Sequence, residues 1–228
     1  MEHKKKAAGE KAAEFVKDGM VVGLGTGSTA WHFIKKLGEM VSDGLFIKAV
    51  TTSQATEKQA SGLRIPMFSV DEVAGIDLLV DGVDEIDHSF NAIKGGGGAL
   101  FREKLIARLS KRIIWILDDS KYKDALGEFP LPVEILPFGY THTLKKLTRM
   151  KFNPILRLTD DEPFVTDNGN YILDLHLEKP INPEELIRKL DAVTGVLEHG
   201  LFLNMCERIV IGREDGVEML ENKAFVPK

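Results

Sequence analysis

The first half of the chain alternates short, continuously apolar runs with stretches whose apolar residues have helical spacing. Residues 3–17, for example, place Ala8, Ala12 and Phe15 on one helical face and lysines on the other. Apolar strands without alternation are typical of a parallel sheet that is covered on both faces. The first half is therefore predicted to be doubly wound α/β. Its expected strands are 20–24, 46–50, 67–70, 76–80 and 112–117, and its expected helices are 3–17, 28–41, 53–61 and 98–109.

The pattern changes after Gly127, Pro130 and Pro132, which indicate a boundary. A strand, helix, strand, strand, helix and strand follow, which is the order of a ferredoxin-like α+β domain. A last strand at 208–211 is expected to return to the first sheet. We therefore expect an α/β domain from residues 1–128 plus 205–228 and a smaller ferredoxin-like domain over 129–204. The expected elements of the second are 133–138, 140–150, 155–159, 170–177, 183–193 and 196–203.

Composition narrows the classes of protein. Of the 228 residues, 43% are apolar and 29% are charged, as in ordinary globular proteins. A net charge of −5 argues against extended binding to nucleic acid or to an anionic membrane, but a small basic pocket for a phosphorylated metabolite stays open. The single cysteine, Cys206, excludes an intramolecular disulfide framework, and we find neither a signal-peptide core nor an apolar run of membrane-spanning length. We expect a cytoplasmic protein.

The stretch from Gly23 to Thr29 predicts a phosphate-binding loop. An apolar strand leads into it and a helical pattern leaves it. Its glycines let backbone N–H groups approach a ligand, and its hydroxyls add donors at a helix N-terminus, where phosphate is favoured. The dinucleotide-binding pattern is excluded because Ser28 stands in place of its third glycine, and no Walker lysine is present. A tight strand-to-helix turn without a ligand is the alternative.

Polar residues follow each of three further strands in this half. Thr51 to Ser53 follow the strand at 46–50, Asp81 to Glu85 follow 76–80, and Asp118 to Lys121 follow 112–117. Ligands of open parallel sheets bind outside the carboxyl ends of the strands, so these residues should converge with the glycine loop. The convergence of hydroxyls, carboxylates and a lysine at one sheet edge is stronger evidence for a site than any single motif.

The carboxylates of Asp81, Asp84, Glu85 and Asp87 admit three interpretations. They could form a solvated turn. They could supply oxygen ligands to Mg²⁺, although they lack the spacing of an EF-hand and a nearby histidine. They could also act as an acid/base pair, since neighbouring carboxylates push their pKa values apart. Spacing alone does not rank the last two.

A second glycine run, Lys94 to Gly98, leads into the last helix of this half. Four consecutive glycines are costly to order, which favours a role in binding over a purely structural one. Their N–H groups could form a nest for an oxyanion beside the Lys94 charge, and a flexible hinge is the alternative. Glu103 follows between Arg102 and Lys104; such a glutamate is usually a surface ion-pair partner, but its position just past the nest makes it a catalytic candidate.

Taken together, these segments closely resemble the A-type ribose-5-phosphate isomerases, in order and over most of the chain. A minor departure is Gly98, where an alanine would be equally familiar; it puts nothing catalytic in doubt. The matching segments are Gly23 to Thr29, Thr51 to Ser53, Asp81 to Ile86, Lys94 to Gly97, Arg102 to Lys104, Asp118 to Lys121, Phe129 to Glu134, and Val165 to Asn170.

The resemblance implies interconversion of D-ribose 5-phosphate and D-ribulose 5-phosphate through an enediolate, without a metal or an organic cofactor. It makes Glu103 the base that moves a proton between C2 and C1, and Lys94 the group that stabilises the oxyanion. It places Asp81 and Asp84 at the sugar oxygens, with Asp81 as the helper in ring opening. The residues that it assigns to the substrate are Lys5, Thr26, Gly27, Ser28, Thr29, Gly95, Gly96, Gly97 and Lys121, with Lys5 reaching the phosphate from the first helix.

Elementary chemistry agrees with this assignment, because aldose–ketose isomerisation needs a base beside a carbon acid, an oxyanion stabiliser and a phosphate anchor. We also expect a homo-oligomer, either a dimer or a tetramer, and no nucleic-acid or membrane partner. The ferredoxin-like domain is the candidate assembly surface, because it carries little of the chemistry.

Three other functions are alternatives to this isomerase activity. A related sugar-phosphate isomerase or deaminase would use a similar sheet and glycine loop. A CoA transferase would need a covalent glutamate and a groove for CoA, and it would leave the lysine and the aspartates without a task. A non-catalytic sugar-phosphate sensor would need an output module, and we find no helix-turn-helix segment in the sequence.

Overall fold

The structure is a computed structural model that describes residues 1–226. It divides into two compact units. The first contains Met1–Val83, Arg102–Tyr122 and the segment from Asn204 onward, and the second contains Asp84–Phe101 and Lys123–Leu203. The sequence analysis placed residues 84–101 and 123–128 in the first domain. The structure joins them to the second unit, because their short strands and backbone hydrogen bonds are made with residues of that unit.

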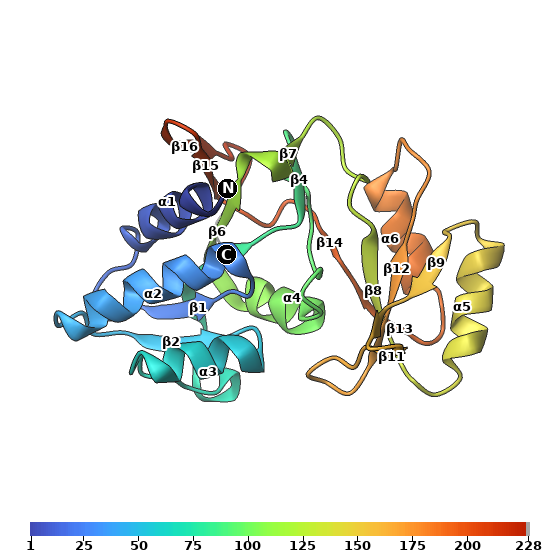
Figure 1. Cartoon of the computed structure of the whole chain (residues 1–228), viewed down its shortest axis with the longest axis horizontal. Coiled ribbons are helices and arrows are strands. Elements are labelled where there is room, and N and C mark those ends of the chain that lie inside the picture. The colour runs from blue at the N-terminus through green and yellow to red at the C-terminus, as the bar shows by residue number, and fades with distance from the viewer. Residues whose placement is uncertain (227–228) are drawn as a thin grey trace. The chain divides into compact units, whose positions relative to one another are not determined.

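A six-stranded sheet forms the centre of the first unit, in the order β16-β15-β6-β3-β1-β2 (Figure 1). Neighbouring strands are parallel except for β15 and β16, which form an antiparallel hairpin. The predicted parallel sheet and the return of the last strand are confirmed. The strands are β1 (Val21–Leu24), β2 (Lys48–Thr51), β3 (Ile76–Gly82), β6 (Ser110–Asp118), β15 (Arg208–Arg213) and β16 (Gly216–Glu221).

Helices cover both faces of this sheet. Val22 and Leu24 of β1 join a buried cluster that includes Phe33. Gly23 points the other way, since a Cβ there would lie 3.1 Å from Cγ2 of Ile106. Because side chains alternate between the faces of a strand, the helices that carry Phe33 and Ile106 lie on opposite faces, as a doubly wound fold requires. The helices are α1 (Glu2–Ala13), α2 (Ser28–Ser42), α3 (Gln54–Gly62) and α4 (Leu100–Leu109), with short 3₁₀ helices η1 (Val70–Glu72) and η2 (Asp119–Lys121).

The first helix lies unusually close to the second because its inner face is made of small residues. Ala8, Gly9, Ala12 and Ala13 are all buried. A Cβ on Gly9 would lie 2.7 Å from the backbone nitrogen of Phe33, so only glycine permits this approach. The close contact brings the first turn of α1 to the start of α2, where the predicted phosphate loop ends.

The second unit contains a four-stranded antiparallel sheet with the order β13-β8-β12-β9. Leu147 of α5 and Leu186 of α6 pack with Val133 and Leu173 in one core, so both helices cover the same face of this sheet (Figure 1). The predicted ferredoxin-like arrangement is confirmed. Its elements are β8 (Leu131–Ile135), α5 (Tyr140–Arg149), β9 (Pro154–Leu156), β12 (Tyr171–Leu175), α6 (Pro183–Asp191) and β13 (Val196–His199), with a small hairpin of β10 (Leu158–Thr159) and β11 (Glu162–Pro163).

A further small sheet, in the order β14-β5-β4-β7, was not predicted. Its strands are β4 (Glu85–Asp87), β5 (Ala92–Ile93), β7 (Tyr122–Lys123) and β14 (Leu201–Phe202). The predicted strand at 196–203 is therefore split at Gly200. A Cβ on Gly200 would lie 2.2 Å from the carbonyl oxygen of Lys94, so the chain passes too closely there for any other residue.

Other expectations were wrong in detail. The helix expected at 3–17 ends at Ala13, and the strand expected at 155–159 is divided into β9 and β10. The strand expected at 67–70 forms only an isolated bridge between Met67 and Ala49, after which η1 begins. The strand expected at 133–138 starts two residues earlier and ends at Ile135. Pro137 follows that end and cannot donate a ladder hydrogen bond.

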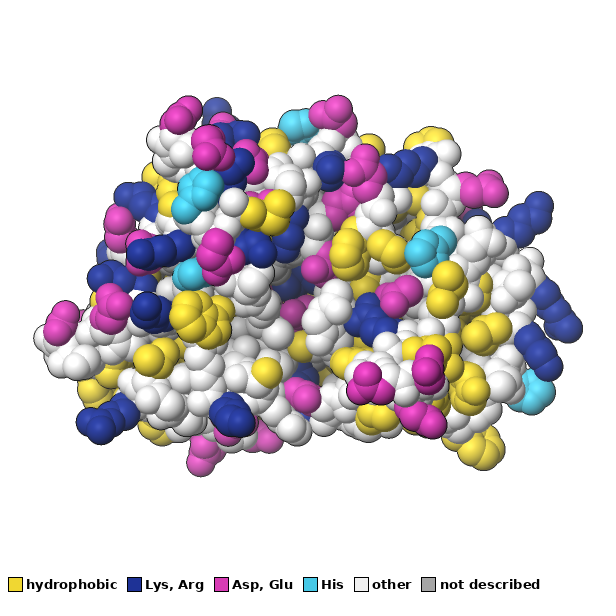
Figure 2. All heavy atoms as spheres, in the orientation of Figure 1, with side chains coloured by type: hydrophobic (Ala, Val, Ile, Leu, Met, Phe, Trp, Pro, Cys, Tyr) yellow, Lys and Arg dark blue, Asp and Glu magenta, His cyan; other side chains and the backbone are white. Residues whose placement is uncertain are grey.

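None of the helices in the described part of the chain is long and apolar enough to cross a bilayer. Figure 2 shows Lys and Arg side chains interspersed with Asp and Glu over the visible face, rather than gathered by sign.

Candidate active site

The predicted phosphate loop connects β1 to α2 in the first unit. The Gly25 N–H donates to the carbonyl oxygen of Val80 at 2.9 Å, which ties the loop to the neighbouring strand β3. Gly27 has φ +117°, a left-handed conformation that favours glycine, and directly precedes α2. Gly27 and Ser28 are exposed, whereas Thr29 is buried. The loop therefore offers a helix N-terminus with accessible backbone, as an anion site requires.

The side chain of Thr26 joins a cluster of hydroxyls. Its Oγ1 lies 2.7 Å from Oγ1 of Thr52 and 2.8 Å from Oγ of Ser53. Thr56 completes the cluster and donates to the carbonyl oxygen of Gly25 at 3.0 Å. Because Thr52, Ser53 and Thr56 follow β2 in the chain, these hydroxyls hold the loop against the segment after β2. Thr56 was not among the predicted site residues, although its place three residues after the capping Ser53 was a usable signal.

Lys5 reaches the loop from α1. Its Nζ donates to Oγ of Ser28 at 2.9 Å. A cation at a helix N-terminus is unfavourable on its own, because the helix dipole is positive there. An anion bound between Lys5 and the loop would remove this repulsion, so the contact is the one expected of a phosphate anchor.

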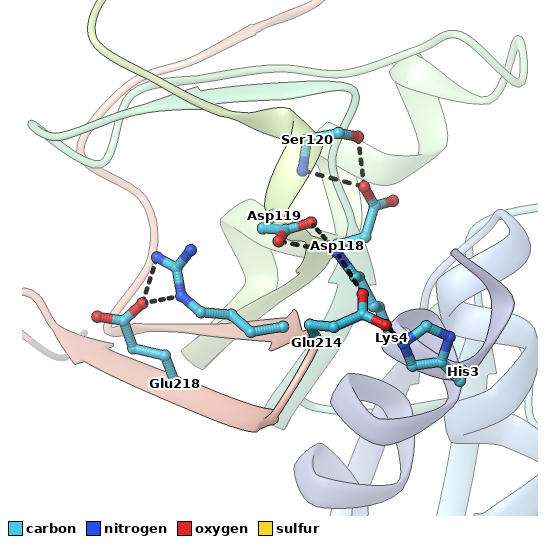
Figure 3. Close-up of polar contacts among 8 residues, drawn as sticks. His3, Lys4, Asp118, Asp119, Ser120, Glu214 and Glu218 are labelled. Atoms are coloured by element: carbon cyan, nitrogen blue, oxygen red, sulfur yellow. Dashed lines mark hydrogen bonds and ion pairs between the residues drawn. The ribbon is translucent and has the colours of Figure 1, made fainter.

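The neighbouring Lys4 is held in an ion-pair cluster (Figure 3). Its Nζ lies 3.0 Å from Oδ2 of Asp119 and 3.2 Å from Oε2 of Glu214. The hydrogen bond to Asp119 raises the pKa of Lys4, and Lys4 in turn lowers the pKa of Asp119. His3 lies 3.4 Å from the same Glu214. The first turn of α1 is thereby tied to η2 and to the β15–β16 hairpin.

Asp81 is the residue before the last of β3 and is fully buried, with 0% of its surface exposed. Its Oδ1 accepts the backbone N–H groups of Thr26, at 2.9 Å, and of Gly82, at 2.7 Å. A Cβ on Gly25 would lie 2.1 Å from the same oxygen. The structure thus brings Asp81 and the glycine loop into direct contact, as the convergence at the sheet edge predicted.

Glu103 and Lys121 belong to the same unit. Glu103 lies in the first turn of α4 and is 4% exposed, so its side chain is buried rather than on the surface. Lys121 ends η2, where Asp118 caps the turn by accepting the N–H of Ser120. Lys121 donates to the carbonyl oxygen of Val83 at 2.7 Å, which ties η2 to the end of β3.

The acidic motif at 81–87 divides into two kinds of carboxylate. Glu85, in the second unit, accepts the backbone N–H groups of Gly127, Glu128 and Phe129 at 3.0 to 3.1 Å. Asp87 accepts the N–H groups of a turn at Ser89 and Asn91. Both are structural. Within residues 1–226, no group of three or more His, Cys, Asp and Glu side chains is arranged to hold a metal ion.

The remaining predicted residues lie in the second unit. The Gly96 N–H donates to Oδ2 of Asp84 at 2.7 Å. Lys94 is 2% exposed, and its Nζ lies 5.4 Å from the centroid of the Phe202 ring, within range of a cation–π interaction. Arg157 was not among the predicted site residues, yet its Nη1 donates to the carbonyl oxygens of Gly95 and Gly96.

A pocket of about 720 Å³ borders the phosphate loop in the first unit. It is open to solvent and takes part of its wall from the exposed Trp31. Its lining residues are Glu2, Thr26, Gly27, Ser28, Trp31, Ala55, Thr56, Lys58 and Gln59.

Comparison with known proteins gives consistent matches. The family model described as ribose 5-phosphate isomerase A (phosphoriboisomerase A) matches residues 48–216. Relatives described as ribose-5-phosphate isomerase A, from Streptococcus pneumoniae and Streptococcus gordonii, are each 50% identical to this chain. Their alignments cover 98% and 97% of this chain, respectively, and 99% of each relative.

Two solved structures are also similar. Ribose 5-phosphate isomerase from Plasmodium falciparum matches with a TM-score of 0.94 at 37% identity, over 98% of this chain and 100% of that chain. A D-ribose-5-phosphate isomerase in complex with phospho-erythronic acid matches with a TM-score of 0.93 at 37% identity, over 96% of this chain and 98% of that chain.

Proposed function

Because the chain belongs to the ribose 5-phosphate isomerase A family, and is therefore an isomerase of the pentose phosphate pathway, we propose that it acts through an enediolate with Glu103 as the base. The substrate pair is D-ribose 5-phosphate and D-ribulose 5-phosphate. Glu103 is suited to this task because its carboxylate is buried in the first turn of α4, away from competing water.

The reaction moves hydrogen without a net change in oxidation state of the molecule. The base removes the proton on C2 of the open-chain aldose, and the electron pair forms a C1–C2 double bond while O1 gains negative charge. The same base returns a proton to C1, and the proton of the C2 hydroxyl passes to O1 as the C2 carbonyl forms. A positioned base supplies about 10²- to 10⁴-fold of such a rate enhancement, so stabilisation of the enediolate is needed as well.

One observation carries the proposal for the first unit. The loop from Gly25 to Ser28 is bonded at Thr26 to the buried Asp81 and at Ser28 to Lys5. A phosphate on this loop would have a cation on one side and a fixed carboxylate on the other. We assign Lys5, Gly27, Ser28 and Thr29 to the phosphate, Asp81 to proton transfer in ring opening, and Lys121 to the sugar.

In the second unit, Lys94 and the glycine run are assigned to the developing oxyanion. An ammonium beside an aromatic ring in a poorly solvated setting stabilises a nearby negative charge strongly. We assign Asp84 to the sugar hydroxyls, with Gly96 holding its carboxylate by a 2.7 Å hydrogen bond. Gly95 and Gly97 complete the run.

A phosphorylated pentose is the substrate class that these groups fit. The solved relative that holds phospho-erythronic acid, a sugar acid phosphate, supports the same class for this chain. Binding energy from the phosphate would orient the sugar carbons at the base.

The test is turnover of purified protein on ribose 5-phosphate in excess EDTA, with ribulose 5-phosphate as the measured product. The proposal expects full activity that EDTA does not change. Activity that disappears with EDTA would contradict the metal-free mechanism and give the aspartates a metal-binding role. Binding of ribose 5-phosphate without any product would instead identify a sensor.

We also propose that the second unit carries a contact between copies of this chain. Phe138 is 97% exposed, and Leu136 and Leu197 are exposed nearby, where the N–H of Leu136 donates to the carbonyl oxygen of Gly195. Exposed apolar side chains grouped in this way are typical of interfaces. Light scattering on the wild type and on Phe138→Ser tests this proposal. We expect the wild type to be an oligomer and Phe138→Ser to dissociate more readily. A monomeric wild type would contradict the proposal.

A further inference from the structure

Two consecutive carbonyls of the glycine run lie against one side chain in the second unit. Nη1 of Arg157 donates to the carbonyl oxygens of Gly95 and of Gly96, each at 3.0 Å. Gly95 has φ +106°, a conformation that L side chains rarely adopt, and this rotation allows both oxygens to reach one nitrogen. The contact is therefore built into the backbone of the run.

The guanidinium that makes this contact is itself fixed. Its Nε donates to Oδ2 of Asp174 at 2.9 Å, and its Nη2 donates to Oδ1 of the same residue, which is a bidentate ion pair. The backbone of Arg157 is held too, since its N–H donates to Ile172 and its carbonyl oxygen accepts the N–H of Phe164, both at 2.9 Å. Arg157 thus presents its free edge to the glycines from a rigid position.

The other end of the run is held by the same segment. A Cβ on Gly98 would lie 2.4 Å from Cζ of Phe164, so ring and backbone are in close contact. The Arg157 guanidinium lies 5.7 Å from the centroid of that ring. Between these two supports, Gly96 and Gly97 are exposed.

The direction of the N–H groups follows from the geometry of the peptide bond. In a trans peptide, the C=O of one residue and the N–H of the next point in opposite directions. The Gly95 carbonyl points to Arg157, and the Gly96 N–H accordingly points away from it, to Asp84 at 2.7 Å. The Gly96 carbonyl also points to Arg157, so the Gly97 N–H is directed away from it as well.

We propose that Arg157 is a positioning residue for the isomerisation: by holding the carbonyls of Gly95 and Gly96, it fixes the N–H groups that face the enediolate and the carboxylate of Asp84. This rests on the proposed function. Donors that are in place before the reaction need no reorganisation when the charge develops. A run of four glycines has the largest conformational entropy to lose, and Arg157 supplies the order that its sequence lacks.

The experiment compares kcat and KM for ribose 5-phosphate in purified full-length variants. Arg157→Met is expected to lower kcat by about 10- to 100-fold, as small misplacements of catalytic groups do, and to change KM less than kcat, because the phosphate loop belongs to the other unit. The matched control is Arg112→Met, which removes another bidentate pair, with Glu207, in the first unit. It is expected to leave kcat unchanged.

If the wild type is active and Arg157→Met has a normal kcat, the positioning role of Arg157 is overturned and the proposed function stands. If the wild type is inactive, both are overturned. An equal loss of kcat in Arg112→Met would also overturn it, because the effect would then reflect stability alone. If Arg157→Met does not fold, Arg157→Lys decides the question. Lysine keeps the charge but cannot hold two carbonyls and Asp174 together, so a reduced kcat supports the proposal and a normal kcat overturns it.

Discussion

The backbone N–H of Thr26 donates a 2.9 Å hydrogen bond to Oδ1 of Asp81. One residue of the glycine loop therefore sets the position of the carboxylate that we assign to ring opening. The contact depends on Gly25, because a side chain at that position would occupy the space of Asp81.

Gly25→Ala is expected to destabilise the protein and to reduce its activity. The added Cβ would lie 2.1 Å from Oδ1 and 2.4 Å from Cα of Asp81, and the backbone atom cannot move aside easily. Overpacking of this kind costs about 1–3 kcal/mol. Thermal unfolding and kcat/KM measure the effect. Gly62→Ala is the control, because a Cβ there would meet nothing within 4 Å, and a similar loss in both variants would contradict the account.

Asp81→Asn is expected to separate ring opening from proton transfer at carbon. The asparagine oxygen can still accept from Thr26 and Gly82, so the loop keeps its geometry, but the proton-transfer group is lost. Conversion of ribose 5-phosphate, which is mainly cyclic, should fall by about 10²-fold. Ribulose 5-phosphate cannot close a furanose ring, since its O5 carries the phosphate, and exchange of its C1 hydrogen with D₂O should stay near the wild-type rate. Equal loss of both rates would remove Asp81 from ring opening.

Gly98→Ala is expected to destabilise this chain. Gly98 has φ +83°, and its Cβ would lie 2.4 Å from Cζ of Phe164. A non-glycine residue in such a conformation costs about 1–3 kcal/mol. Phe164→Leu should recover part of the loss by removing the ring atoms in the way. A double-mutant cycle from denaturant unfolding measures the coupling, and strictly additive effects would show that the ring is not the obstacle.

Lys4→Met is expected to raise KM for ribose 5-phosphate about two- to five-fold with kcat unchanged. Lys4 holds the turn of α1 that carries Lys5, through its pair with Asp119 (Figure 3). Lys6→Met is the control, because Lys6 is exposed and pairs with the exposed Glu10. An equal change in KM from both substitutions would point to general loss of positive charge instead.

The same pair predicts a pH dependence of stability. Asp119 has a lowered pKa, so its contribution is complete above the ordinary value of 3.8 and is lost as the pH falls through the lowered value. Lys4 has a raised pKa, so its contribution is complete below 10.5 and is lost as the pH rises through the raised value. Lys4 also lowers the pKa of Glu214 from its ordinary value of 4.5, so the difference in unfolding midpoint between wild type and Lys4→Met should be constant between about pH 4.5 and 10.5 and shrink outside these limits. A difference that persists in strong acid would contradict the pair.

Local patterns were sufficient to predict the strand–loop–helix unit around Gly27 and the αβ order of both units. They could not show that Asp81 and Glu85, which lie in one motif, have different roles. Glu85 is structural because it binds N–H groups at 127–129, more than forty residues away. The contact of Arg157 with Gly95 spans 62 residues and has no local signal in the sequence. Such roles depend on tertiary contacts, and residue type and spacing do not encode them.

The most direct test of the account is the hydrogen exchange of ribulose 5-phosphate at C1 in D₂O, followed by NMR with Glu103→Gln. Glutamine keeps the size of the side chain but cannot take a proton. We predict that exchange and isomerisation both fall by at least about 10²-fold, while inorganic phosphate still binds to the loop of Gly27 and Ser28 with unchanged affinity. Exchange at a near-normal rate in a folded Glu103→Gln variant would contradict the assignment of Glu103 as the base.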